Sequence, residues 1–134
     1  ARKTIAGAGT QGAALGFGGK VPGRSALTES WNGTAWTEVG DLNTVAEDPT
    51  GTGATNTAAI CIGGDRNPIS GKTETWDGSS WTEVADLATA RYGSMAAGTS
   101  LSAVAAGGET GSVSNATEEW TVPTELKSLA STNA

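Results

Sequence analysis

The sequence predicts an all-β fold made of three repeated units, and two observations carry that prediction. Runs of five to seven apolar or small residues are bounded by Gly, Asn, Asp and Pro, and no apolar pattern keeps the 3.6-residue period of a helix. The 134 residues also include 20 Gly but a single Phe and a single Tyr. Large apolar side chains are therefore few, and any core must be thin and shared among several small sheets.

The repeat is visible in three glycine pairs that lie 45 and then 44 residues apart. Each pair is followed at the same distance by Thr-Glu and then by a Trp. Self-similarity at such a period is typical of repeat architectures. The residues concerned are Gly18-Gly19, Gly63-Gly64, Gly107-Gly108, Trp31, Trp76 and Trp120. The predicted units are 1–43, 44–88 and 89–126, the last with a degenerate final strand, followed by a tail or linker at 127–134.

Each unit is predicted to form four short antiparallel strands. The first is rich in Gly and Ala ("TIAGAGT", "SMAAGT"), the second ends at the glycine pair, and the last two form a hairpin. Asn32-Gly33 and Asp77-Gly78 tolerate positive φ, so we expect a tight two-residue turn at each. Residues on either side of such a turn share one face of the sheet. The expected neighbours are Trp31 with Trp36 and Trp76 with Trp81.

The tryptophans have a physical purpose in this arrangement. A four-stranded sheet of about 45 residues cannot bury either face alone, so successive sheets must stack face to face. One Trp covers ~200 Å², worth about 4–5 kcal/mol before ordering entropy is subtracted. We therefore expect all four hairpin tryptophans to lie between sheets, and the Gly/Ala-rich first strands to lie where the sheets converge.

The pattern of a double glycine, an aromatic residue followed by Asp or Asn, and a second aromatic residue resembles the kelch repeat of β-propellers. The residues that carry the resemblance are Gly18-Gly19, Arg2, Trp31-Asn32 and Trp36 in the first unit and Gly63-Gly64, Trp76-Asp77, Trp81 and Arg91 in the second and third. The third unit departs from it, because "WTVPTEL" replaces "WDGSSWTEV". Segments such as "ESWNGTAWTEV" and "TARYGSMAAGT" also look like those of the low-complexity kelch-like arrays in fibre and adhesin proteins of marine bacteriophages.

This resemblance implies that the chain forms three blades of a β-propeller. A propeller ring needs four to eight blades to close. Three blades would leave two open ends, each with unpaired edges or an apolar face. The expected partner is a second copy that closes a homo-oligomeric ring, or further repeats of a longer chain, or a fibre stack. The implied location is a virion or an extracellular surface.

Composition narrows the function. The formal charge is −6 with no basic cluster, which argues against nucleic acid, and no apolar run is long enough for membrane insertion. There is no histidine, so no catalytic residue, cofactor or metal site is expected. The repeated Glu29, Glu74 and Glu118 are interpreted as structural, and the oxygen-rich segment 65–71 as a plain turn rather than a calcium loop. The only cysteine, Cys61, lies in an apolar run and is expected to be buried.

Two arginines occupy the same place in their units, and the middle unit has Glu47 there. We expect Arg2 and Arg91 to bridge to carboxylates of a neighbouring unit, with Glu47 as a candidate partner; a ligand-binding role is the alternative.

Binding, if present, is expected in the variable loops after the glycine pairs, which keep their length while their sequences differ. Their candidate ligand-binding residues are Arg24, Asp65, Arg66, Asn67, Glu109 and Asn115. The first functional hypothesis is a non-enzymatic attachment module that presents these loops to a glycan or receptor. The alternatives are a purely structural decoration or spacer protein and, third, a propeller glycosidase.

Overall fold

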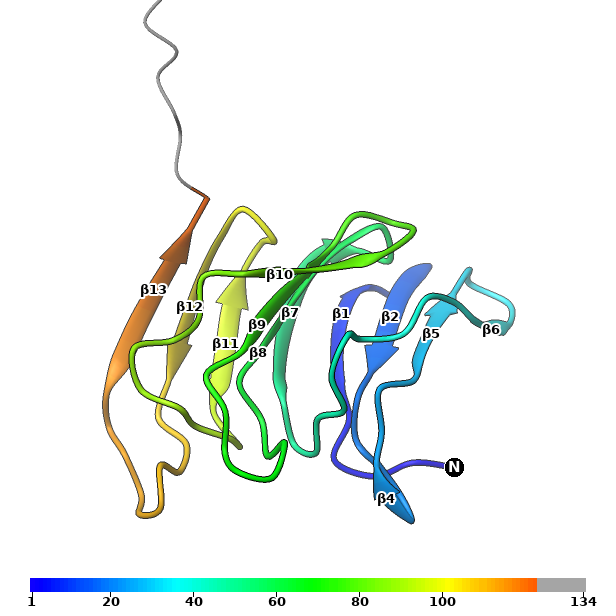
Figure 1. Ribbon diagram of the computed structural model, residues 1–134. Coiled ribbons are helices and arrows are strands. Elements are labelled where there is room, and N and C mark those ends of the chain that lie inside the picture. Colours follow the sequence, from blue (N-terminus) through cyan, green and yellow to red (C-terminus); the bar gives the residue numbers. More distant parts are fainter. Residues whose placement is uncertain (123–134) are drawn as a thin grey trace, which may run out of the picture.

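The computed structural model describes residues 1–122, and this part of the chain is all-β, as predicted. Three antiparallel sheets stand side by side in chain order (Figure 1). The first sheet comprises β1 (Ala6–Thr10), β2 (Ala13–Phe17), β5 (Thr28–Trp31) and β6 (Trp36–Glu38). The second comprises β7 (Thr50–Thr55), β8 (Ala58–Ile62), β9 (Thr73–Trp76) and β10 (Trp81–Val84). The third comprises β11 (Met95–Gly98), β12 (Ser102–Ala106) and β13 (Thr117–Thr121).

The first strands of the sheets lie next to one another, with β1 beside β7 and β7 beside β11. Small residues allow this approach. A Cβ atom at Gly51 of β7 would lie 2.5 Å from the ring of Phe17. This distance is too short for two carbon atoms, so a larger residue at position 51 would push the sheets apart. The Gly- and Ala-rich first strands therefore occupy the side on which the sheets converge, as their composition predicts.

An aromatic core fills the space between the first and second sheets. The Phe17 ring meets the Trp81 ring edge-on, with centroids 4.9 Å apart. The Trp81 indole nitrogen donates a hydrogen bond to Thr28 Oγ1 at 3.0 Å, so its polar edge is satisfied inside the core. The buried apolar residues here are Ala6, Leu15, Phe17, Leu42, Ala46, Ala59, Cys61, Trp76 and Trp81.

A smaller core joins the second sheet to the third. Ile60 and Ile62 of β8 pack against Ala103 and Ala105 of β12, with Trp120 partly buried at the edge. Ile62 takes the place of Phe17 here, and within the described residues the third sheet has no counterpart of Trp81, so less apolar surface is buried between these two sheets.

The paired tryptophans are neighbours, as predicted. The ring centroids of Trp31 and Trp36 are 5.5 Å apart, and those of Trp76 and Trp81 are 5.4 Å apart. The expectation that all four lie between sheets is wrong for the first sheet: Trp36 is 52% exposed, and the half-buried Trp31 lies beside it on the same face, whereas Trp81 is only 5% exposed. The tryptophan side of each sheet points toward the preceding sheet, and the described chain places no sheet before the first.

The hairpin turns differ from the expected two-residue type. Trp31 pairs directly with Trp36 across the strands, which leaves four residues in the turn. Only the glycines take positive φ, 92° at Gly33 and 100° at Gly78. The preceding Asn32 uses its side-chain Oδ1 to accept the backbone N–H groups of the last two turn residues. Asp77 does the same in the second sheet, so each residue acts as an acceptor and not as a left-handed turn residue.

The loop after the first glycine pair contains a short hairpin that the sequence did not predict, formed by β3 (Lys20–Val21) and β4 (Gly23–Arg24). The degenerate final strand of the third unit was predicted in a region that lies mostly outside the described residues. The predicted tail at 127–134 lies wholly outside them. Within residues 1–122 there is no helix long and apolar enough to cross a membrane.

Replacing equivalent tryptophans measures the packing between sheets. Trp81→Ala removes a buried ring and is expected to lower the free energy of unfolding by about 3–5 kcal/mol. Trp36→Ala, at the equivalent but exposed position, is expected to cost no more than about 1 kcal/mol. Urea unfolding of both variants at low protein concentration checks this difference, and equal losses would contradict the assigned packing.

The Asp77 turn predicts a pH dependence. Hydrogen bonds from the backbone N–H groups of Ser80 and then Ser79 lower the Asp77 pKa from 3.8 to about 2. A carboxylate with a lowered folded-state pKa stabilises the fold fully above pH 3.8, and this stabilisation is lost as the pH falls toward 2. Asp77→Asn keeps the accepting oxygen, as Asn32 does in the first sheet. The variant has no carboxylate to protonate at this position. As the pH is lowered from 5, its thermal unfolding temperature should therefore fall less steeply than that of the parent chain.

Candidate functional site

A Glu–Arg ion pair stands at the base of the loop in every sheet. The pairs are Arg2–Glu29, Arg66–Glu74 and Arg91–Glu118. Each guanidinium also donates to the carbonyl of the first glycine of its own pair, namely that of Gly18, Gly63 or Gly107. One arginine thus joins the third strand of a sheet to the point where the loop begins.

The expected bridges from Arg2 and Arg91 to a neighbouring unit are therefore wrong, because both arginines bond within their own unit. Glu47, their expected partner, pairs instead with Lys20 at 3.1 Å. The guanidinium groups of Arg2 and Arg91 are engaged and largely buried, so the alternative role in ligand binding does not fit them either. The repeated glutamates accept these bonds, which agrees with their structural interpretation.

The middle unit keeps the same ion pair by a different route. Arg66 reaches down from the loop and donates to Glu74 Oε1 at 3.2 Å and to the Thr44 carbonyl at 2.7 Å. Its side chain is 3% exposed and that of Glu74 is fully buried. Arg66 is therefore not available to a ligand, and the candidate surface does not include it. The sequence holds one signal for this exchange, since a Glu at position 47 coincides with an Arg two places after the glycine pair.

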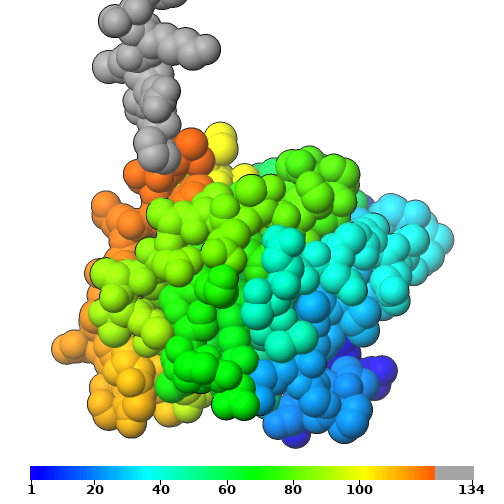
Figure 2. Space-filling view, in the orientation of Figure 1, coloured from blue at the N-terminus to red at the C-terminus, as the bar shows by residue number. Residues whose placement is uncertain are grey.

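The three loops gather at one end of the stack. Figure 1 shows them at the lower end of the sheets, and Figure 2 shows this margin running from blue through green to orange without a break. We call the loops 20–27, 65–72 and 109–116 together the loop row. Successive sheets have the same strand order, so equivalent loops fall at the same end of each sheet.

Arg24 and Asp65 connect the first two loops. Arg24 Nη2 lies 2.6 Å from Asp65 Oδ2, and both side chains are 30% exposed. The bond from Arg24 is the main cause that lowers the Asp65 pKa, and the same bond raises the pKa of Arg24. Asp65 Oδ1 also accepts the backbone N–H of Asn67 at 3.0 Å. The sequence-predicted residues Arg24, Asp65 and Asn67 thus form one connected surface.

Glu109 and Asn115 lie in the third loop and are exposed. Glu109 Oε2 accepts a hydrogen bond from the Tyr92 hydroxyl at 2.5 Å, and this bond is the main cause that raises the Tyr92 pKa. Within residues 1–122, no hydrogen bond or ion pair joins either residue to Arg24 or Asp65, so the third loop contributes a separate patch of the row.

The loop row offers polar groups suited to binding. It presents a guanidinium, carboxylates, amides and backbone groups, all of which can hydrogen-bond a hydroxylated ligand. Within residues 1–122, no group of three or more His, Cys, Asp or Glu side chains is placed to hold a metal ion. Burial raises the pKa of the Cys61 thiol to about 12, so this cysteine is a packing residue and not a nucleophile.

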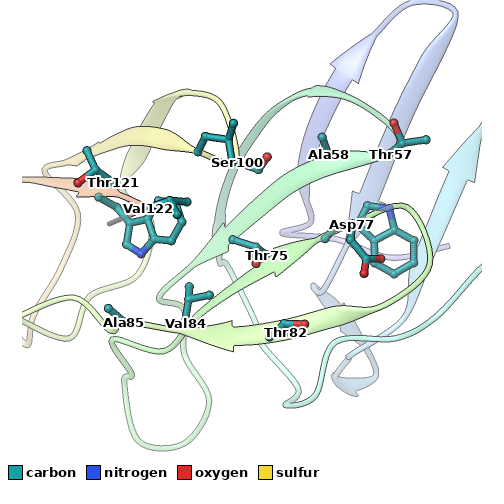
Figure 3. Close-up of a pocket in the computed structure, with 13 residues that line it drawn as sticks. Thr57, Ala58, Thr75, Asp77, Thr82, Val84, Ala85, Ser100, Thr121 and Val122 are labelled. Carbon is teal, nitrogen blue, oxygen red and sulfur yellow. The ribbon is translucent and has the colours of Figure 1, made fainter. Parts of the chain in front are cut away.

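A separate cavity of ≈ 570 Å³ opens between the second and third sheets (Figure 3). Thr75, Thr82 and Val84 approach it from β9 and β10, and Ser100 and Thr121 approach it from the third sheet. Trp76 and Trp120 also line it. At the contact between the first and second sheets, β10 with Trp81 fills the corresponding space. The cavity therefore lies where a fourth strand of the third sheet would pack.

The Trp120 indole nitrogen is buried without a hydrogen-bond acceptor in the described part of the chain. Its equivalents are satisfied, because Trp31 donates to the Gln11 carbonyl at 2.9 Å and Trp76 to the Asn56 carbonyl at 3.0 Å. Among residues 1–122, the third sheet thus lacks the acceptor that the other two sheets provide for the equivalent tryptophan.

Comparison with known proteins supports the fold and goes no further. No protein-family model matches the chain, and no curated protein matches it. Solved structures do match, and one of them is reported as the structure of YjhT. It superposes with a TM-score of 0.76 at 16% sequence identity, over 92% of this chain and 44% of the YjhT chain. The chain therefore spans less than half the length of this structural neighbour, and the likeness at this identity concerns the fold alone.

The buried ion pair under the middle loop gives a testable consequence. Arg66→Met leaves the buried Glu74 carboxylate without its cation and is expected to cost about 3–5 kcal/mol of unfolding free energy. The double variant Arg66→Met/Glu74→Gln removes the uncompensated charge and should recover part of that loss. Arg2→Met should cost less, because the Glu29 side chain is 43% exposed. Chemical denaturation measures all three, and a neutral Arg66→Met would contradict the assigned role.

Proposed function

We propose that the chain is a non-enzymatic attachment module, made of three kelch-like blades of a β-propeller, that presents the loop row to a glycan or cell-surface receptor on a virion or surface fibre. The observation that carries this proposal is the gathering of three sequence-variable loops at one end of a repeated scaffold. In each sheet, a guanidinium fixes the start of the loop, which separates the exposed residues from the packing below them.

Three features support the propeller interpretation. Each sheet runs outward from its first strand in chain order, the first strands of neighbouring sheets adjoin, and each sheet stacks face to face on the next. These are the relations that blades have around a propeller axis. The tryptophan side always points toward the preceding sheet, so the contact has one direction and can be repeated.

The charged and amide groups of the loop row support glycan binding. Sugar hydroxyls are recognised by side chains that donate and accept in fixed positions. Arg24 is held by Asp65 but uses only some of its five N–H groups, and Asn67 beside it is exposed. This pair of loops is therefore the part of the row most suited to orient a polar ligand.

Two alternatives remain as competing proposals. A structural decoration or spacer protein would need the stacked sheets but no ligand. A propeller glycosidase would need a carboxylic acid and a carboxylate facing one another across a sugar. Of the repeated glutamates, each is bound to an arginine in its own sheet, and this engagement favours the non-enzymatic proposal.

Binding to an immobilised glycan array, with neutral and acidic oligosaccharides, tests the proposed function. Asn67→Ala combined with Arg24→Ala is expected to reduce the bound signal by tenfold or more, since each removes a hydrogen bond of about 1 kcal/mol or more to the ligand. Thr34→Ala, an exposed change in the β5–β6 turn away from the loop row, is the matched control and should bind normally.

The outcomes separate the three proposals. Absence of binding to every glycan, together with a folded chain, would favour the structural alternative. Release of sugar from any arrayed oligosaccharide, abolished by a single Glu→Gln change, would contradict the non-enzymatic proposal.

A further inference from the structure

Two faces at opposite ends of the stack have no neighbouring sheet in the described chain. The open face is the side of the first sheet that points away from the second, and the outer face is the corresponding free side of the third sheet. Trp36 lies on the open face and is 52% exposed, while Met95 lies on the outer face and is 56% exposed. Large apolar side chains exposed on otherwise buried sheets mark interaction surfaces.

The contact between the first and second sheets shows how such faces fit together. There Trp81 packs on Phe17 and donates to Thr28 Oγ1 at 3.0 Å. Trp36 holds in the first sheet the position that Trp81 holds in the second, and Thr117 holds in the third sheet the position of Thr28. The open face therefore carries one half of this contact, and the outer face carries the other half.

The volumes of the two faces are complementary. Gly7 and Gly16 pair across β1 and β2 on the open face, beside a hollow of ≈ 380 Å³ that Trp36 also lines. In the first sheet the bulky side chain that fits such a hollow is Phe17, and its cross-strand neighbour is the small Ala6. On the outer face the sizes are exchanged, since the bulky residue stands on the first strand of the sheet and the small residue on the second.

That exchange places Met95 opposite a small residue, Ala106, at the positions of Ala6 and Phe17. One bulky apolar side chain is thus still presented at this point, from the first strand rather than the second. A flexible methionine suits an irregular hollow of this kind.

We propose that the open face of the chain binds the outer face of a second copy, so that two copies close one ring of six sheets. Trp36 of one copy packs on Ala106 and donates to Thr117 of the other, and Met95 enters the hollow over the glycines. This inference rests on the proposed propeller fold. It is a head-to-tail contact, which forms a ring where the rotation closes.

A polar contact between the first and second sheets also has equivalent residues at the two free faces. Asn56, in the β7–β8 turn, donates its side-chain amide to Ser30 Oγ of the first sheet at 2.9 Å. The equivalent residues at the free faces are Gln11 and Glu119, both exposed. The Gln11 amide then meets a carboxylate, which strengthens the hydrogen bond at the same point of the contact.

The chain length of the structural neighbour agrees with two copies. The matched region covers 92% of this chain but 44% of the YjhT chain. The YjhT chain is therefore roughly twice as long as this chain, which is the amount of protein that two copies supply.

Native mass spectrometry and sedimentation velocity of the whole chain at micromolar concentration test the proposal. The expected species has the mass of two chains. Trp36→Ala and Met95→Ser should each weaken the dimer about thirtyfold, as truncation of a central interface residue does. Both side chains are exposed in the single chain, so each variant should remain folded, and the unfolding of dilute protein should change no more than the small amount expected for Trp36→Ala above. Val113→Ser, an 87% exposed change in the third loop, is the control and should remain dimeric.

A monodisperse monomer, a dimer that Trp36→Ala does not weaken, or an open-ended ladder of masses would each overturn the two-copy ring. Failure of the attachment function is recognised separately. A dimer that binds no glycan removes that function and leaves the interface intact, whereas a monomer that binds glycan through the loop row does the reverse.

Discussion

The structure depends on face-to-face burial of tryptophan between small sheets. Each sheet is too short to form a core of its own, and its neighbour supplies the other half. Between the first and second sheets, Phe17, Trp76 and Trp81 provide the volume, and a glycine on β7 provides the room. Because the buried indole of Trp81 also donates to Thr28, packing and hydrogen bonding fix the same relative position of the two sheets. A slip of one sheet against the other would lose both at once.

The same constraint explains why the three sheets are unequal. The contact between the second and third sheets is built from isoleucine and alanine, and a cavity remains where a fourth strand would pack. The Trp120 indole nitrogen is buried there without an acceptor among the described residues. At the opposite end, Trp36 has the position of a core residue but the exposure of a surface residue. Burial of a repeated residue is therefore decided by its neighbours and not by its place in the repeat.

Much of the fold could be predicted because repetition and alternation are recorded directly in the sequence. The spacing of Gly18-Gly19, Gly63-Gly64 and Gly107-Gly108 predicts three equivalent units, and the Trp-x₄-Trp spacing places two indoles on one face. The exposure of Trp36 could not be predicted, because it depends on what stands beside the first sheet. The role of Asn32 and Asp77 was missed for a different reason: Asn-Gly and Asp-Gly suit several turn types, and only the backbone geometry distinguishes a left-handed residue from a side-chain acceptor.

The location of the candidate site could be predicted from the sequence, but which loop residues are exposed there could not. Loops that keep their length while their sequences differ are expected at a surface, and Arg24, Asp65 and Asn67 do lie together there. Arg66 is the exception, since a charged residue in a polar loop gives no local sign that it turns inward to a buried glutamate. The in-sheet anchoring of all three arginines has an evolutionary consequence. Each unit carries the arginine that supports its own loop, so gene duplication or exchange of a unit can bring in a new loop already braced from within, and only contacts between loops, such as that of Arg24 with Asp65, need matching changes in the adjoining unit.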